Sequence, residues 1–279
     1  QVLFPYDKQT AEVKASLPVA LDRHFWSFRR LLKERSDFGN YIEDRGLLWY
    51  EHSMFFPARF RTQLGISFAE VSTHNHFVFD RGGKVFKQTA PVVKLPTGSG
   101  EEEHLGLLGL LNSSVACFWL KQVCFPKGGD QVGGEGARVR KTLWDERYAI
   151  NASNVAEFPM CSTRPTEVAT RLDAQARQLT GLQPAAQMST DTLPTRASLD
   201  AARDQAACLR RLMIAGQEEL DWQCYHLYGL LPAGVTIDEL AYGAQVEVNL
   251  GERPFEIVLA RRIAAGLEAT AWFERHGST

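Results

Sequence analysis

The sequence is poor in the features that mark secreted, membrane-spanning or disulfide-stabilised proteins. It has 5 cysteines among 279 residues, an odd number, and no two of them form a CxxC pair. A disulfide framework or a zinc knuckle is therefore not expected. No run approaches the roughly 18 apolar residues of a membrane span. The N-terminus lacks the basic start and apolar core of a signal peptide. These absences predict reduced, mostly buried thiols in a cytoplasmic protein without a membrane partner.

Motifs of catalysis are also missing. An amino-methyltransferase requires a glycine-rich turn after a strand for its sulfonium cofactor, and an Asn/Asp-Pro-Pro-aromatic tetrapeptide that holds the flipped base. Phe4-Pro5-Tyr6-Asp7 has one proline and no acceptor before it, and Gly133-Gly134-Glu135-Gly136 is not GxGxxG. No GxSxG elbow or HExxH motif is present. We therefore assign no catalytic, cofactor-binding or metal-binding residue from the sequence, and expect the chain by itself to be non-catalytic.

Charge is nearly balanced over the whole chain but unevenly distributed. The formal net charge is −2, with 44% hydrophobic and 23% charged residues, which is typical of a globular protein. Residues 1–150 hold 20 Lys and Arg against 17 Asp and Glu, whereas residues 151–279 hold 11 against 16. The basic surplus favours a DNA-facing N-terminal half, although ordinary scatter of surface charge produces an imbalance of this size as well.

The pattern of residues predicts an α+β fold in two parts. Residues 1–160 form a mixed α/β domain whose sheet contains a β-hairpin between Val71 and Leu95. In its first strand His74, His76 and Val78 share one face, and residues 75, 77 and 79 share the other. The turn at residues 80–84 contains two glycines that can adopt positive φ, and the return strand begins at residues 85–87.

Helices account for the remaining predicted elements. The first begins at about Pro18, and an apolar helix runs from His104 to Val123 with a polar Asn-Ser-Ser step inside it. After residue 160 the sequence predicts a helical spacer, in which a helix with Pro165 in its first turn and Gly181 past its end packs antiparallel on a longer one. The longer helix runs from its N-cap Ser198 to about Tyr228, and a last helix covers residues 254–276. The acidic residues of the long helix are expected to form a solvated face, and they are Asp200, Asp204, Glu218, Glu219 and Asp221.

Several long phrases together resemble the PglX family, the adenine-specific DNA methyltransferases of BREX and phage-growth-limitation defence. They are STHNHFVFDRGGKVF (residues 72–86), APVVKLP (90–96), LLGLLNSSVACFWLKQV (107–123), GAR (136–138) and FEIVLARRIAAG with TAWFERHGST at the end. More distantly, LNSS and EELDWQCYHLYGL (218–230) resemble the specificity domain of type IIG and TaqI-like methyltransferases. The likeness covers nearly the whole chain.

The resemblance implies the parent enzyme's activity and this chain's share in it. The family transfers a methyl group from S-adenosylmethionine to adenine N6 in double-stranded DNA, which marks the host's own DNA. The sequence lacks the methyltransferase domain, so the chain is expected to be a C-terminal target-recognition portion that needs no cofactor itself. Its partners would be duplex DNA, the missing methyltransferase domain and other proteins of the defence system.

Basic and amide side chains in residues 1–160 are the candidates for DNA contact. Cations beside a flexible glycine-rich loop are expected at phosphates: Lys121, Lys127, Arg138, Arg140 and Lys141. Side chains that can reach base edges or the adjoining groove are Arg59, Arg61, Gln63, His74, Asn75 and His76. Arg81, Lys84 and Lys87 lie on or beside the hairpin turn. The hairpin could equally be scaffold.

Two other functions remain open from the residues alone. The acidic helical half could dock another component of a defence complex, in which case the chain is a protein-interaction module. His74 and His76 share a strand face and could bind a metal ion, as in a nuclease, but the sequence shows no third ligand.

Overall fold

The computed structural model describes residues 3–127, 146–188, 193–231 and 248–276. These residues form two compact units, each made of two separate stretches of the chain. Unit 1 consists of residues 1–65 and 80–87, and unit 2 of residues 66–79 and 88–279. Helices predominate over short antiparallel strands, so the predicted α+β class is confirmed. No helix in the described parts combines the length and apolar character needed to cross a bilayer.

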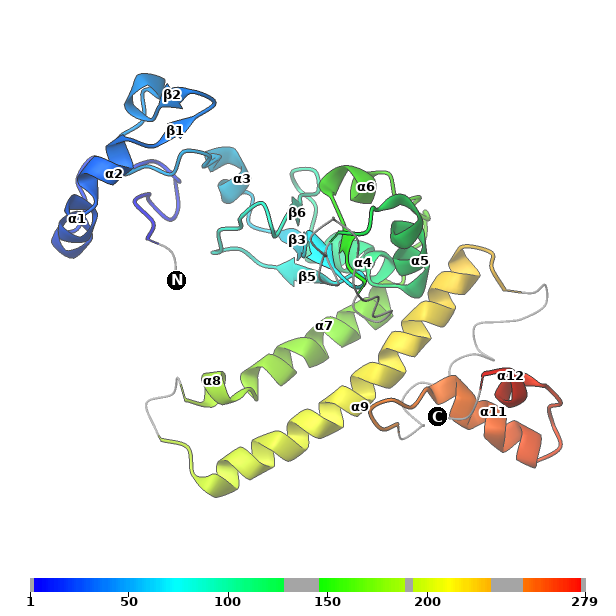
Figure 1. Cartoon of the computed structure of the whole chain (residues 1–279). Coiled ribbons are helices and arrows are strands. Elements are labelled where there is room, and N and C mark those ends of the chain that lie inside the picture. Colours follow the sequence, from blue (N-terminus) through cyan, green and yellow to red (C-terminus); the bar gives the residue numbers. More distant parts are fainter. Residues whose placement is uncertain (1–2, 128–145, 189–192, 232–247, 277–279) are drawn as a thin grey trace, which may run out of the picture. The chain divides into compact units, whose positions relative to one another are not determined.

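Unit 1 contains short helices and strands (Figure 1), and its buried side chains include the aromatic residues Tyr6, Phe25 and Tyr50. The elements are α1 (Val19–Trp26), α2 (Arg29–Lys33), β1 (Ser36–Asp37), β2 (Asn40–Tyr41), η1 (Glu43–Arg45) and α3 (Pro57–Arg61). The predicted first helix is therefore interrupted. Phe25 is buried, and Phe28 leaves helical geometry with φ −111° and ψ 10°, which separates α1 from α2.

Hydrogen bonds between side chains and the backbone connect distant segments of unit 1. The hydroxyl of Tyr6 accepts from the His52 amide at 2.7 Å, and the Tyr50 hydroxyl donates to the Lys14 carbonyl at 2.6 Å. The Arg35 guanidinium donates to the carbonyl oxygens of Leu32, Trp49 and Glu51, each at 2.9 Å. Burial lowers the pKa of Arg35 and raises that of Tyr6 to about 12. Arg35 thus links the end of α2 to the segment at residues 49–51 within unit 1.

Unit 2 is built on a small sheet and two helices that follow it. Strand β3 (Gly65–Phe68) lies between β5 (Phe77–Asp80) and β6 (Val92–Val93), and β4 (Val71–Ser72) pairs with β7 (Tyr148–Ala149). The helices α4 (Glu101–Leu111) and α5 (Ser114–Val123) come next, then α6 (Ala152–Ala156). Every residue of α4 from His104 onward is buried. The predicted burial of the helix from His104 to Val123 is therefore confirmed for α4 only. The helix is broken at Asn112 and Ser113, and in α5 Ala116 and Leu120 are buried while Phe118 is 69% exposed.

The predicted β-hairpin is wrong, and its first strand is shorter than predicted, because β5 begins at Phe77 and residues 74–76 are not in a strand. The predicted alternation of faces is right. Phe77 and Phe79 are buried while Val78 is half exposed. The chain then turns at Gly82 and Gly83, both with positive φ, and Lys84 returns to form a 2.8 Å ion pair with Asp80. No strand occurs at residues 85–87, and β5 pairs with β3 instead. The expected third extended piece does form a strand, β6, which pairs antiparallel with β3.

After residue 160 the structure has α7 (Thr166–Gly181), α8 (Pro184–Gln187), α9 (Arg196–Leu227), α11 (Pro254–Ala264) and α12 (Trp272–His276). Helices α7 and α9 lie side by side and run in opposite directions (Figure 1), as predicted. The N-cap of α9 is Thr195, whose hydroxyl accepts from the Ser198 amide at 3.1 Å, so Ser198 was the wrong cap. Gly229 follows with φ +65°, as expected of a stop signal.

Glycines allow the helices of unit 2 to approach closely. A Cβ on Gly109 would lie 3.0 Å from the Cβ of Ala169 and 3.0 Å from the Pro165 ring. A Cβ on Gly106 would lie 2.8 Å from the Thr166 hydroxyl. Helix α7 therefore packs directly on the backbone of α4, which joins residues on both sides of position 160. The predicted division at residue 160, between a target-recognition domain and a helical spacer, is a division of function and stays a prediction.

Candidate nucleic-acid interface

Six of the candidate DNA-binding residues belong to unit 1. Arg59 and Arg61 lie in the last turn of α3, and Gln63 follows it. The segment that carries Arg81, Lys84 and Lys87 lies against this region, because a Cβ on Gly82 would be 3.2 Å from the Gln63 Cβ. The fold of unit 1 therefore brings the segment at residues 81–87 close to the end of α3, although the two are about 20 positions apart in the sequence.

The cations of this neighbourhood differ in their partners. The Arg59 guanidinium stacks on the Phe56 ring at 4.7 Å, and Lys84 is paired with Asp80. Arg61 and Lys87 are exposed and have no ion-pair partner among the described residues. Since a guanidinium or ammonium without a carboxylate partner is available to a phosphate, these two side chains are the better candidates for contact with a backbone.

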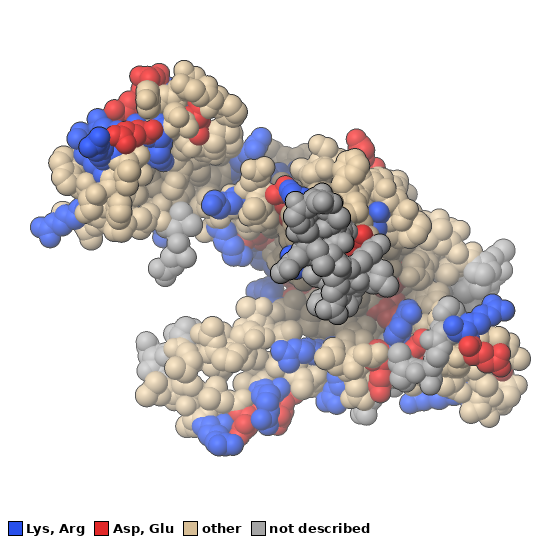
Figure 2. Space-filling view, in the orientation of Figure 1, with Lys and Arg blue, Asp and Glu red and all other residues tan. Residues whose placement is uncertain are grey.

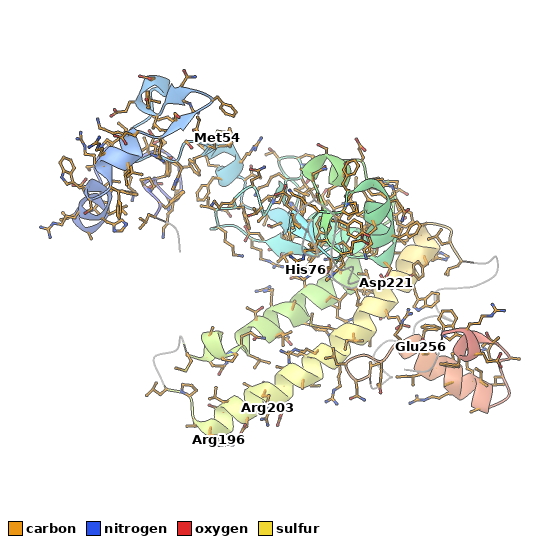
Figure 3. All side chains as sticks on the ribbon, in the orientation of Figure 1. Met54, His76, Arg196, Arg203, Asp221 and Glu256 are labelled. Atoms are coloured by element: carbon orange, nitrogen blue, oxygen red, sulfur yellow. The ribbon has the colours of Figure 1, made fainter. Side chains whose placement is uncertain are left out.

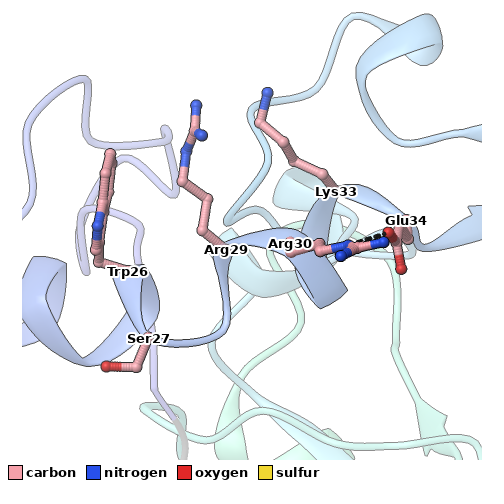
Figure 4. Close-up of a pocket in the computed structure, with 6 residues that line it drawn as sticks. All are labelled: Trp26, Ser27, Arg29, Arg30, Lys33 and Glu34. Atoms are coloured by element: carbon pink, nitrogen blue, oxygen red, sulfur yellow. Dashed lines mark hydrogen bonds and ion pairs between the residues drawn. The ribbon is translucent and has the colours of Figure 1, made fainter.

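A basic hollow on α1 and α2 escaped our sequence-based list of candidates. It measures about 510 Å³ and is lined by Trp26, Ser27, Arg29, Arg30, Lys33 and Glu34. The Arg29 guanidinium lies 4.8 Å from the Trp26 ring and 5.7 Å from the Trp49 ring. Figure 4 shows Arg29 and Lys33 extending to one side of α2, while Arg30 turns to its partner Glu34. The available signal is the Trp and Arg content of residues 26–30, WSFRR, for which the sequence favours a solvated amphipathic helix over a helix that contacts DNA phosphates.

Acidic side chains limit the positive potential of this hollow. Glu34 binds Arg30 at 2.8 Å and Glu43 binds Lys33 at 2.8 Å. Figure 2 shows the resulting mixture of blue and red over this part of unit 1. Even so, the segments of unit 1 hold 13 Lys and Arg against 9 Asp and Glu, whereas the segments of unit 2 hold 18 against 24. The basic surplus predicted for the N-terminal half is thus concentrated in unit 1.

The His-Asn-His segment of unit 2 divides into inward and outward side chains. Asn75 donates from Nδ2 to the carbonyl oxygens of Leu111 at 2.7 Å and Ser113 at 3.1 Å. His74 and His76 are exposed, with ring centroids 6.3 Å apart. Asn75 therefore supports the junction of α4 and α5, and its amide hydrogens are not directed to a base. Within the described residues no three His, Cys, Asp or Glu side chains are arranged to hold a metal ion.

Asn112, at the end of α4, also connects the α4–α5 junction to the chain around residues 75–77. Its Oδ1 accepts from the Phe77 amide and its Nδ2 donates to the Phe77 carbonyl, both at 2.9 Å. It thus joins the end of α4 to β5 as an added strand residue would. The Ser113 hydroxyl caps α5 by accepting from the Ala116 amide at 3.2 Å. The Asn-Ser-Ser motif therefore has a structural role as the junction between α4 and α5.

Lys121 and Lys127 lie beside the β4–β7 ladder. The Lys121 ammonium is 5.6 Å from the Tyr148 ring, and the Lys127 ammonium is 3.6 Å from the Glu70 carboxylate. The Lys127 amide donates to the Arg147 carbonyl at 2.6 Å. This bond brings together the segments that flank residues 128–145. The candidates Arg138, Arg140 and Lys141 lie outside the described residues.

The acidic residues at the end of α9 do not form the solvated face that we expected. Asp221 accepts from the amide and hydroxyl of Ser114, both at 2.7 Å, and Glu218 accepts from the Phe255 amide at 2.7 Å. Glu219 pairs with Arg171 at 2.5 Å. Figure 3 marks Asp221 on α9. Packing of α5, α7 and α11 against α9 converts these carboxylates into helix caps and an ion-pair partner. Asp200 and Asp204 remain in surface ion pairs.

Comparison with known proteins gives first a domain and then a relative. Residues 213–279 match the model of a family described as a domain of unknown function, DUF7008. Over 278 residues, 99% of its length, the chain is 45% identical to "Adenine-specific methyltransferase PglX" of Streptomyces coelicolor. The chain spans 23% of the length of that protein. The resemblance to PglX predicted from the sequence phrases is therefore confirmed.

Proposed function

We propose that this chain is the target-recognition portion of an adenine-specific (N6) DNA methyltransferase of a phage-defence system. The observation that carries the proposal is the 45% identity over almost the whole chain to 23% of PglX. A protein that methylates adenine must find its site on a duplex, and the remaining length of such an enzyme supplies the S-adenosylmethionine site and the chemistry. We further propose that the chain alone neither binds this cofactor nor methylates, and that it acts in the cytoplasm.

Charge supports unit 1 as the part that meets DNA. Its segments carry the basic surplus, and Arg61 and Lys87 are available to phosphates, as described above. Phosphate contacts fix the position of a protein on a duplex, while base contacts read the sequence. The proposed set also includes the exposed His74 and His76 of unit 2, Lys121 and Lys127, and the basic residues Arg138, Arg140 and Lys141. The α7–α9 pair, with α9 roughly 48 Å long at 1.5 Å per residue, would act as a spacer toward the catalytic domain.

The test is the salt dependence of binding to duplex DNA. We expect weak binding by the 279-residue chain, with log K falling as log salt rises. Replacing Arg59, Arg61 and Lys87 by alanine, or Arg138, Arg140 and Lys141, should weaken binding to all sequences. Each triple variant should reduce the magnitude of the salt slope by about 2 to 3, because each lost phosphate contact contributes about 0.9.

A variant of equal charge change provides the control. Arg196, Arg203 and Arg210 are exposed residues in the first half of α9, far along the chain from the proposed contacts. Their joint replacement by alanine should leave the slope unchanged. If both sets of proposed contacts can be removed without altering the slope, DNA recognition by these residues is refuted. Calorimetric binding of S-adenosylmethionine by the purified chain would contradict the proposed division of labour.

A second function is favoured by one observation, the acidic surplus of unit 2, with 24 Asp and Glu against 18 Lys and Arg. A unit of this charge suits a basic protein surface, so the helical part could dock another component of the defence system. Gel shifts at low salt separate the two proposals. A pure docking module should not retain duplex DNA even where electrostatic attraction is strongest.

A further inference from the structure

An aromatic side chain at the tip of the β1–β2 hairpin has an unusual conformation. The two residues of the turn, Phe38 and Gly39, have φ of +53° and +85°. A two-residue hairpin turn with both φ values positive normally carries Asn-Gly or Asp-Gly. For a bulky residue such as Phe, positive φ is strained. Phe38 is also 91% exposed, so nothing in unit 1 that the structure describes compensates the strain by burying the ring.

The exposed ring borders a hollow in the same unit. The hollow measures about 760 Å³, and its lining includes Phe38, Phe55, Phe56, Met54, Arg45 and Arg61. This volume lies within the range of about 300 to 1,000 Å³ that is usual for small-molecule sites. Figure 3 marks Met54 between the hairpin and α3. Aromatic and apolar side chains therefore form one part of the lining and two guanidinium groups another.

Contacts within unit 1 hold this lining in place. Arg45 donates to the Asp37 carboxylate at 2.7 Å and to the Ser53 carbonyl at 3.2 Å, which fixes the hairpin to the segment before α3. The Phe55 ring packs on the Tyr6 ring at a centroid distance of 4.2 Å. A hollow with a fixed wall loses little freedom when a flat ring enters it, which favours binding.

The chemistry of the lining matches a nucleobase with its phosphate. Bases stack on Phe rings with little dependence on sequence, because every base has a π face. Arg61 is exposed and has no carboxylate partner within the described residues, so it can meet a phosphate beside a stacked base. The buried carboxylate of Glu51 is satisfied by the Leu48 amide at 2.7 Å. Glu12, which is exposed, is the acidic side chain at the margin. The basic surplus of unit 1 favours an anionic ligand over an apolar peptide.

We propose that this hollow binds one unstacked nucleobase of DNA, with Phe38 stacked on the base and Arg61 on the adjoining phosphate. The inference rests on the proposed function, in which DNA is the partner of this chain. It adds a site for a base that has left the duplex stack, which contacts to an intact duplex do not require. Local opening of the duplex accompanies the chemistry of enzymes that modify bases, since the target base must leave the helix.

The experiment compares two DNA probes on the 279-residue chain. One is a fluorescein-labelled duplex, and the other is the same duplex with one unpaired adenine in its centre. We expect the bulged probe to bind about 5- to 150-fold more tightly, a range set by stacking of one base on an aromatic ring. Phe38→Ala and Phe38→Asn should abolish this preference and leave the affinity for the perfect duplex unchanged, whereas Phe38→Tyr should keep it.

A matched control is Phe28→Ala, because Phe28 is an exposed aromatic residue of the same unit, 47% exposed, that does not line the hollow. It should keep the preference. Since Phe38 is almost fully exposed, its variants should fold, and an unchanged near-ultraviolet circular dichroism spectrum would establish this. Photocrosslinking from an unpaired 5-iodouracil should mark Phe38 or Phe56.

The outcomes separate this inference from the proposed function. Retention of both probes with equal affinity, and no effect of the Phe38 variants, would overturn the base site and leave duplex recognition standing. Retention of neither probe at low salt would overturn both. A crosslink confined to unit 2 would place the unpaired base elsewhere and would also refute the site in this hollow.

Discussion

At the residue scale, Asn75 shows how a plausible DNA-reading side chain is occupied by the fold. Asn and Gln are suited to adenine in the major groove, and the position of Asn75 between two histidines in the sequence favoured contact with DNA. Its amide group instead donates to the carbonyl oxygens of Leu111 and Ser113, both of which belong to buried residues. Its first task is therefore to satisfy backbone groups at the junction between α4 and α5.

Replacing Asn75 by alanine should lower the stability of the protein. The buried Leu111 carbonyl oxygen would lose this partner, whereas that of Ser113 keeps the Cys117 amide at 3.0 Å. An unsatisfied buried polar group costs about 1 to 3 kcal/mol. Urea unfolding followed by circular dichroism measures the loss. The control is His76→Ala, at the neighbouring exposed position, for which we expect a change within about 0.5 kcal/mol. Equal stability of the Asn75→Ala variant and the unmodified chain would show that the junction does not depend on this amide.

At the scale of elements, α9 caps two other helices with its own carboxylates. Asp221 accepts from the first amide of α5, and Glu218 accepts from Phe255 in the first turn of α11. Negative charge at a helix N-terminus is favourable because it complements the helix dipole and the free amides there. Trp222 and Phe255 add an edge-to-face contact with centroids 6.0 Å apart. The long helix thus organises the elements before and after it.

Burial gives these caps a pH dependence. Desolvation raises the pKa of Asp221, and the hydrogen bonds from Ser114 and Gln217 and the charge of Arg253 offset this only in part. The pKa of Glu218 is raised for the same leading reason. A carboxyl group with a raised pKa binds more protons in the folded state than in the unfolded state. Its contribution to stability is therefore present below the unfolded pKa and is lost as pH rises through the folded value.

The variant Asp221→Asn cannot ionise, so it should remove the loss of folding stability that Asp221 causes as pH rises. It keeps an oxygen that can accept from the Ser114 amide. Relative to the unmodified chain, it should gain stability as pH is raised from about the ordinary Asp pKa of 3.9 toward neutrality. Denaturant unfolding at a series of pH values measures the difference. Asp221→Ala should be less stable at every pH because the cap is lost. The control Asp200→Asn alters a carboxylate in surface ion pairs and should show no comparable trend. A pH-independent difference for Asp221→Asn would contradict the assignment.

At the scale of the whole molecule, the two units are not consecutive along the chain. Strands β3 and β5 of unit 2 lie in the sequence between the two segments of unit 1. Phe79 of β5 stacks on His104 of α4 at a centroid distance of 5.4 Å, and Phe77 is bound through its backbone to Asn112. The sheet therefore covers α4, whose residues from 104 onward are all buried.

This arrangement predicts where the chain can be divided. A fragment of residues 66–279 keeps the sheet and should unfold cooperatively. A fragment of residues 88–279 lacks β3 and β5, so it exposes the apolar surface of α4 and should bind a hydrophobic dye and unfold at lower urea concentration. Comparison of the two fragments by dye fluorescence and circular dichroism tests the prediction. Equal midpoints and equal dye binding would show that the sheet is not required by α4.

The sequence by itself determined the elements whose signals are local. Apolar periodicity and glycine stops indicated α7, α9 and the end of α9 at Gly229, and alternation indicated the faces of residues 74–79. The likeness to PglX also followed from the printed phrases alone. These signals lie within a few residues of each other, so neighbouring side chains are enough to express them.

Only the tertiary structure decided which partners these elements take. It paired β5 with β3 rather than with residues 85–87, assigned Asn75 and Asp221 to the support of helix ends, and placed the turn at residues 80–87 beside Gln63. Periodicity records that a side chain is buried, but not against which distant segment. A buried amide or carboxylate must find a partner wherever the fold offers one, and that choice depends on residues far away in the chain.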